Sequence, residues 1–358
     1  MDHEGRVARL QNELTEADMD GLFVTDLTNV RYLTGFSGTN GQVLITRDSA
    51  TFLTDGRYRA RAASLVAGAE IVIYPDRLSD ALPSLVEKKG VKRLGIEAAN
   101  VTLASRDALA SAAGGAELVP TTGMVEKLRR VKDADEVQQL ESAIAIADAA
   151  FEWIQDRLAP GRTEVEIALD LEVQMRQSGA DEISFPPIVG SGPLSAHIHH
   201  TPSQRALEKG DLVLMDFGAR VGGYCSDMTR TVVLGAAGEE QLRIYEIVGR
   251  AQQAGIDALG PGVRGVDADA AARKVIDDAG HGDVFEHGLG HGVGLDIHEA
   301  PRLARTSEDV LVVGDVVTVE PGVYIGGLGG VRIEDCALIT ENGARVLGSA
   351  PKDRLLEL

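Results

Sequence analysis

Short apolar stretches rich in β-branched residues alternate with helix-like segments along the first third of the chain. The strand-like stretches cover residues 21–25, 42–46 and 71–74, and a helix-like segment covers 58–67. Strands that alternate with helices in this way indicate an α/β unit. We therefore expect an N-terminal α/β domain over residues 1–124.

A change of pattern marks the end of this domain. A basic stretch at 127–132 leads into Asp133, which suits the N-cap of a helix. Apolar residues then recur at spacings of three and four as far as Ile154, the pattern of one long helix. The domain boundary is therefore expected near 124–132, with the second domain over 125–358.

The second domain repeats one order of elements. Helices predicted at 133–158 and 163–178 precede strands that continue to about 235. Helices at 239–260 and 266–279 then precede strands from about 284 to 340. The expected fold class is α+β, with two similar halves packed face to face. A site built from both halves would lie where they meet, a common place for a ligand pocket.

Composition and charge narrow the function classes. Of 358 residues, 55 are acidic and 35 are basic, which gives a formal net charge of −20. A surface this acidic disfavours nucleic acid and anionic membranes as partners. No signal-peptide core follows the first residues, and no apolar run reaches about 18 residues. The two cysteines, Cys225 and Cys336, form no disulfide framework, so we expect a cytoplasmic protein.

Four carboxylates stand at unusual positions in predicted strands. Asp216 ends the apolar run from Leu212, and Asp227 follows eleven residues later, across glycines that suit a hairpin-like connection. Glu320 follows a β-branched run, and Glu334 lies inside a single strand that we expect over residues 331–339. An ionised carboxylate on a buried strand is costly unless it is paired or bound to a cation. One alone is usually a solvated edge residue, but four together indicate a metal site.

A glycine-rich segment supplies a histidine to this set. Glycines flank His291 on both sides and leave its imidazole unobstructed. The segment does not open a clear helix, which argues against a phosphate-binding loop and against a zincin pair of His287 and His291. One imidazole among four carboxylates suits Mn²⁺, Co²⁺, Fe²⁺ or Zn²⁺ better than Ca²⁺ or Mg²⁺.

These motifs resemble the pita-bread metallopeptidases, a family that includes methionine aminopeptidase, prolidase and aminopeptidase P. The shared sequence motifs are Ser-Asp-Met-Thr-Arg-Thr, Gly-His-Gly-Val-Gly, Val-Glu-Pro-Gly and Val-Arg-Ile-Glu-Asp. The resemblance implies a creatinase-like N-terminal domain followed along the chain by a C-terminal pita-bread fold of two pseudo-symmetric halves. It also implies two divalent ions, with Mn²⁺ expected and Co²⁺, Zn²⁺ or Fe²⁺ as alternatives. The implied ligands are Asp216, Asp227, His291, Glu320 and Glu334.

The same resemblance assigns further roles around the metals. Glu320 is expected to carry a proton during peptide hydrolysis as well as to bind metal. His199 lies seventeen residues before the first ligand and His298 seven residues after His291, and both are expected to contact the substrate. His197 and His200 flank His199 and remain alternatives for its role. Arg302 is the candidate clamp for a substrate carboxylate.

The N-terminal domain favours a peptidase that acts before proline over methionine aminopeptidase. We favour an Xaa-Pro dipeptidase (prolidase), because Arg302 suits the carboxylate of a dipeptide. The alternative is an Xaa-Pro aminopeptidase that accepts longer peptides. A non-hydrolytic binding protein on the same fold is a weaker reading, since all five ligands are present. The expected partners are short proline-containing peptides and a second copy of the chain in a homodimer.

The two cysteines lie two residues from a ligand, Cys225 from Asp227 and Cys336 from Glu334. We favour buried hydrophobic packing for both. The alternative is that they make an enzyme sensitive to thiol reagents.

Overall fold

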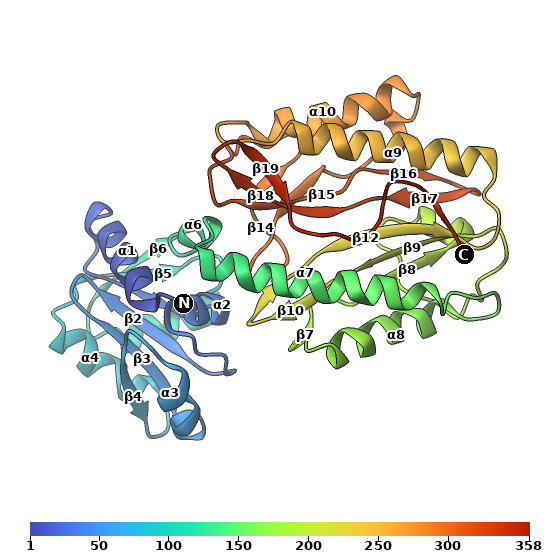
Figure 1. Cartoon of the computed structure of the whole chain (residues 1–358). Helices are drawn as coiled ribbons and strands as arrows, with labels where there is room; N and C mark the ends of the chain where they lie inside the picture. Colours follow the sequence, from blue (N-terminus) through green and yellow to red (C-terminus); the bar gives the residue numbers. More distant parts are fainter. The chain divides into compact units, whose positions relative to one another are not determined.

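A computed structural model describes residues 1–358 as two compact units, Met1–Arg129 and Arg130–Leu358. Each unit has its own strands and helices (Figure 1). No helix is both long and apolar enough to span a bilayer.

The first unit contains a six-stranded mixed sheet in the order β4-β3-β2-β1-β5-β6. Its strands are β1 (Gly21–Val24), β2 (Gln42–Thr46), β3 (Ala50–Asp55), β4 (Glu70–Tyr74), β5 (Arg93–Glu97) and β6 (Glu117–Thr121). Its helices are α1 (His3–Glu16), α2 (Leu27–Thr34), α3 (Arg59–Leu65), α4 (Leu82–Lys88), α5 (Leu103–Ala112) and α6 (Glu126–Arg130). The α/β prediction for this part of the chain is confirmed.

The second unit is built from two helix pairs and the strands between them. The helices are α7 (Ala134–Gln155), α8 (Glu164–Gln177), α9 (Glu239–Asp257) and α10 (Gly265–Asp278). Asp133 caps α7 as predicted: its carboxylate accepts from the Glu136 N–H, and the Glu136 carboxylate accepts from the Asp133 N–H. Figure 1 shows α7–α8 and α9–α10 along opposite edges, with the strands between them.

The strands of the first half are β7 (Glu182–Ile183), β8 (Ile188–Ser191), β9 (Leu212–Phe217), β10 (Ala219–Val221), β11 (Tyr224–Cys225) and β12 (Met228–Val233). Those of the second half are β13 (Gly290–Gly292), β14 (Glu299–Leu303), β15 (Val316–Val319), β16 (Gly322–Ile325), β17 (Gly329–Arg332), β18 (Asp335–Thr340) and β19 (Gly343–Val346). The last strand, β20 (Leu356–Glu357), pairs with β12. The main sheets run β20-β12-β9-β8 and β14-β13-β15-β18-β19.

Backbone hydrogen bonds show that the two halves share the same arrangement of turns and strands. The Leu207 N–H donates to the Arg162 carbonyl, and the Leu311 N–H donates to the Val263 carbonyl. The turn before the central strand also recurs. Its aspartate, Asp211 or Asp315, accepts from the N–H three residues earlier, at 2.8 and 2.9 Å. The predicted two-half fold is confirmed.

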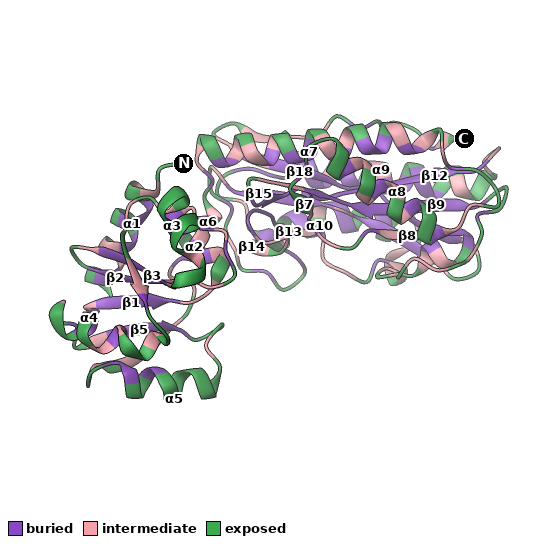
Figure 2. Ribbon diagram, turned by 90° about the horizontal axis from the view of Figure 1, so that it is seen from below, coloured by how far each residue is buried: buried purple, intermediate pink, exposed green.

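Apolar side chains fill the space between each helix pair and its sheet. In the first half, Phe151 and Leu171 belong to one core cluster with Met215. In the second, Ala272 belongs to a cluster with Val317. Figure 2 shows the buried strands in purple, whereas the outer helix faces are largely exposed. Polar groups on these strands therefore lie in a low-dielectric interior.

We predict that Asp315→Ala destabilises the second unit by about 3–5 kcal/mol, because it leaves Arg130 without its buried partner. Asp315 is fully buried, and its Oδ2 lies 2.7 Å from Arg130 Nη2. Differential scanning calorimetry would measure the loss. The control is Glu341→Ala on an exposed turn. A shift no larger than the control's would contradict the prediction.

Candidate metal site

The first half supplies two carboxylates. Asp216 lies near the end of β9, and Asp227 immediately precedes β12. These strands pair antiparallel, with Asp216 opposite Thr229. The predicted hairpin is formed by β10 and β11 between them, with Val221 opposite Tyr224. The hairpin reverses the chain direction, so the carboxylates of Asp216 and Asp227 lie in the same part of the second unit.

The second half supplies the other three groups. His291 lies on β13, and the register of this strand with β14 shifts between His291 and Gly292. Glu320 directly follows β15. The single strand expected over 331–339 was wrong: the chain pairs with β16 as far as Arg332 and with β15 from Asp335. Glu334 lies in the break, where the chain leaves one sheet for the other.

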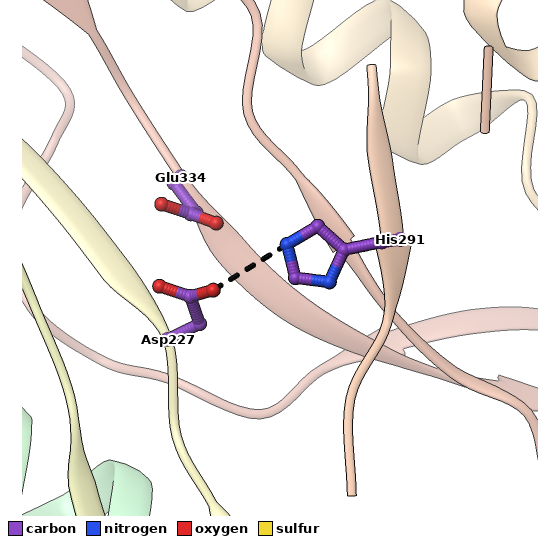
Figure 3. Close-up of side chains that lie close together, drawn as sticks. All are labelled: Asp227, His291 and Glu334. Carbon is purple, nitrogen blue, oxygen red and sulfur yellow. Dashed lines mark ion pairs between the residues drawn. The ribbon is translucent and has the colours of Figure 1, made fainter. Parts of the chain in front are cut away.

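Three of the five predicted ligands form a compact group. Each of Asp227, His291 and Glu334 offers a ligand atom, and these atoms lie within 4.8 Å of one another (Figure 3). The His291 Nε2 atom is 3.5 Å from Asp227 Oδ2 and 3.4 Å from Glu320 Oε1. The structure thus brings groups from both halves together.

Asp216 lies outside this compact group of three, but its charge and its contacts link it to the site. Its Oδ2 accepts a 2.5 Å hydrogen bond from Arg332 Nη2. Its Oδ1 is buried and has no hydrogen-bond partner. A buried unpartnered carboxylate oxygen is uncommon and calls for an explanation. A bound cation would provide one.

Burial dominates the electrostatics of the cluster. Burial together with the charges of Glu334 and Asp216 raises the pKa of Asp227 well above its ordinary value. Burial and the Glu320 charge do the same for the pKa of Glu334. Burial raises the pKa of Glu320 to about 8 and lowers the pKa of His291 to about 4. A metal-free site therefore retains protons that cations would displace.

The residues fit divalent metal ions. Their donors are four carboxylates and one imidazole with a low pKa, which leaves that imidazole neutral and able to bind metal. Carboxylates can bridge ions about 3.5–4 Å apart. The mixture of oxygen and nitrogen donors favours Mn²⁺, Fe²⁺, Co²⁺ or Zn²⁺.

Thr229 and Tyr324 support the site, and neither had a sequence signal of its own. Thr229 Oγ1 donates to Glu334 Oε2 at 2.6 Å, and it accepts from Arg332 Nε at 2.9 Å. Arg332 Nη1 also donates to the Tyr324 hydroxyl at 3.0 Å, and that hydroxyl lies 2.8 Å from His287 Nε2. Arg332 therefore connects the surroundings of Asp216 and Glu334, as groups around metal ligands often do.

The two predicted substrate histidines lie beside this buried set and are themselves exposed. The His298 ring centroid is 4.4 Å from that of His291. The charges of His199 and His298 both act on the Asp216 carboxylate, opposing the upward shift that burial gives its pKa. His200, one of the alternatives, instead contacts Glu164 at 2.8 Å.

Arg302 stands opposite His291 in the β13–β14 pair. Directly opposed residues of antiparallel strands project from the same face. Arg302 is exposed, and its guanidinium has no hydrogen bond or ion pair. Alongside burial and His298, its charge lowers the pKa of His291. An unpaired guanidinium beside the site can receive a carboxylate.

Both cysteines are buried and free. Burial raises the pKa of the Cys225 thiol and raises that of Cys336 further. Cys336 Sγ contacts the Asp227 carbonyl oxygen at 3.4 Å. Protonated buried thiols are poor nucleophiles, which supports the packing role.

Comparisons with known proteins cover the whole chain. The family model "Metallopeptidase family M24" matches residues 138–341, and "Creatinase/Prolidase N-terminal domain" matches 6–131. A solved Xaa-Pro dipeptidase from Bacillus anthracis is 43% identical, with a TM-score of 0.97 over 99% of this chain and 100% of that one. An Xaa-Pro dipeptidase from Pyrococcus furiosus is 36% identical over 98% of this chain and 99% of its own length. A solved X-Pro aminopeptidase from Thermotoga maritima is 32% identical, with a TM-score of 0.91 over 95% and 98%.

Metal should stabilise the protein more at higher pH. The raised carboxylate pKa values mean that the metal-free folded state binds more protons than the unfolded state. Its stability therefore falls as pH rises from the unfolded value of about 4 towards the Glu320 value of about 8. We predict that excess Mn²⁺ raises Tm more at pH 8 than at pH 5.5, with a stabilisation of about 2.7 kcal/mol at 100 times Kd.

Thermal scans of chelated and reloaded protein would measure this difference. Asp227→Ala should abolish the metal-dependent shift, whereas Asp283→Ala, at an exposed position, should keep it. Equal Tm with and without Mn²⁺ at both pH values would refute the metal site.

Proposed function

The chain belongs to metallopeptidase family M24 and carries a creatinase/prolidase N-terminal domain, and on that premise we propose that it hydrolyses Xaa-Pro dipeptides. Relatives named Xaa-Pro dipeptidase align over nearly its full length, which supports this substrate class. The alternative, an Xaa-Pro aminopeptidase, accepts longer peptides.

The observation that carries the choice of dipeptides is the free guanidinium of Arg302, opposite His291. In a dipeptide the proline carboxylate lies one residue from the scissile bond. A cation close to the metal site therefore favours a substrate that ends there. Arginine can hold such a carboxylate with two parallel hydrogen bonds.

We assign two divalent ions to Asp216, Asp227, His291, Glu320 and Glu334. When bound, such ions supply Lewis acidity and lower the pKa of water. We assign proton transfer to Glu320, whose Oε1 lies 3.4 Å from His291 Nε2 within the ligand group. It takes a proton from the attacking water and returns it to the leaving nitrogen of proline.

The exposed histidines act on the substrate. His298, beside the His291 ring, is positioned to donate to the oxyanion that forms on the scissile carbonyl. His199 interacts with the same region through Asp216, and it can hold the substrate during the reaction. Pre-positioned donors of this kind stabilise developing charge without reorganising.

The finer expectations remain part of this proposal. We take Mn²⁺ as the working metal, a homodimer as the assembly and the cytoplasm as the location. The functional domain limits are kept at 1–124 and 125–358.

We predict that a metal-loaded preparation hydrolyses an Xaa-Pro dipeptide at least about tenfold better, in kcat/KM, than the matching Xaa-Pro-Xaa tripeptide. The reason is that added residues remove the carboxylate from the reach of Arg302, a loss of about 1.4 kcal/mol or more. Release of the N-terminal amino acid would be followed by chromatography. Rapid tripeptide turnover with little dipeptide activity would instead identify an aminopeptidase.

Arg302→Ala should lower kcat/KM for the dipeptide about 10–100-fold, as expected for a charge-assisted hydrogen bond of about 1.5–3 kcal/mol. Activity on the same dipeptide with an amidated C-terminus should change little, because no carboxylate is present. Arg354→Ala, at another exposed arginine, is the control. An equal loss on both substrates would argue against a carboxylate clamp.

A further inference from the structure

One of the buried carboxylates outside the ligand set lies at the first position of α8. Glu164 is fully buried, yet no arginine or lysine pairs with it. Its Oε1 accepts from Ser191 N at 2.8 Å and from Ser191 Oγ at 2.7 Å. Its Oε2 accepts from Ser203 N at 3.0 Å, Ser203 Oγ at 2.7 Å and His200 Nε2 at 2.8 Å.

This arrangement requires a carboxylate rather than an amide. Both oxygens only accept, so together they satisfy five donors, whereas glutamine offers one accepting oxygen. Burial opposes ionisation, but hydrogen bonds from Ser203, His200 and Ser191 outweigh it and lower the pKa of Glu164. Glu164 therefore fastens both ends of residues 191–203 to the start of α8.

The segment has another anchor on the second half. Ser195 Oγ accepts from the Gly330 N–H at 2.8 Å and donates to the Gly192 carbonyl at 2.6 Å. Gly330 lies on β17, and a Cβ there would come within 2.2 Å of the Ser195 carbonyl oxygen. This close approach fixes the backbone at Ser195. Only four residues, 196–199, separate this anchor from His200.

His199 lies at the end of this short span, next to the anchored His200. The Ile198 carbonyl beside it lies 3.5 Å from Arg332 Nη1. His197 is exposed, and its ring centroid is 5.9 Å from that of His200. The three histidines therefore differ in surroundings: His200 contacts a buried carboxylate, His199 interacts with Asp216, and His197 does neither.

We propose that Glu164 and His200 are positioning residues that hold His199 at the metal site. The inference rests on the proposed function only for the assay, because the anchoring is a property of the folded chain. Without the His200 hydrogen bond, no side-chain hydrogen bond holds the chain between Ile198 and Ser203, and His199 can leave its working position.

The test compares His200→Ala with His200→Gln in the metal-loaded full-length protein, using Xaa-Pro dipeptide hydrolysis. His200→Ala leaves four of the five hydrogen bonds to Glu164, so the fold should persist. We expect kcat to fall about 10–100-fold while KM changes less than about threefold, as for a misplaced catalytic group. The glutamine amide can replace the Nε2–H donor, so His200→Gln should recover kcat to within about threefold of wild type. Asp283→Ala, at an exposed position outside this segment, is the control and should stay within about twofold.

Hydrogen exchange and metal content separate this inference from the proposed function. Amide exchange across residues 196–203 should quicken about tenfold or more in His200→Ala and stay near wild type in His200→Gln, with bound metal unchanged in both. Wild-type protein inactive on dipeptides would sink the proposed function, while the exchange result would still support or reject the anchoring. Unchanged kcat and exchange in His200→Ala would overturn the inference. Loss of bound metal or of Tm without rescue by glutamine would also overturn it, because the role would then be structural.

Discussion

The crowding of negative charge at the centre of the second unit is the constraint on which the remaining features depend. Four carboxylates surround one imidazole there, and the His291 Nε2 atom lies within 3.5 Å of two of them. Ligand oxygens of Asp227 and Glu334 lie within 4.8 Å of each other, and at such a distance in a low-dielectric interior unscreened carboxylates repel one another by several kcal/mol. The cluster therefore holds either protons or cations, and the single guanidinium of Arg332 cannot neutralise all four charges.

The duplicated arrangement of turns and strands explains how the chain builds this cluster. In each half a Gly-Asp turn opens the central strand, and an acidic ligand follows five residues after that aspartate: Asp216 after Asp211, and Glu320 after Asp315. The turn fixes the strand's start, so it also fixes where the ligand stands. A ligand set divided between the halves links metal binding to their correct packing.

Much of this could be predicted from sequence, because a carboxylate on an apolar strand is an anomaly that can be seen locally. The helix capped by Asp133 and the strand that carries Asp216 followed from such local rules. The break at Glu334 could not be predicted, since it depends on which strands Arg332 and Asp335 pair with. The role of Thr229 could not be predicted either, because its contact with Glu334 joins segments about a hundred residues apart, where the Glu334 N–H also donates to the Thr229 carbonyl at 3.1 Å. The repeated Gly-Asp turns were a signal that could have strengthened the prediction of two halves.

The residues assigned to metal binding and those assigned to substrate binding differ in how far they are buried. The acidic ligands are largely buried and held by hydrogen bonds, so their geometry is set by the core. His199, His298 and Arg302 are exposed, and each depends on backbone placement: an anchored loop, the turn after β13 and a cross-strand register. Such positions can vary without disturbing the buried carboxylates. One metal centre can therefore serve peptidases that differ in the length of peptide they accept, as the similarity to both dipeptidases and an aminopeptidase would require.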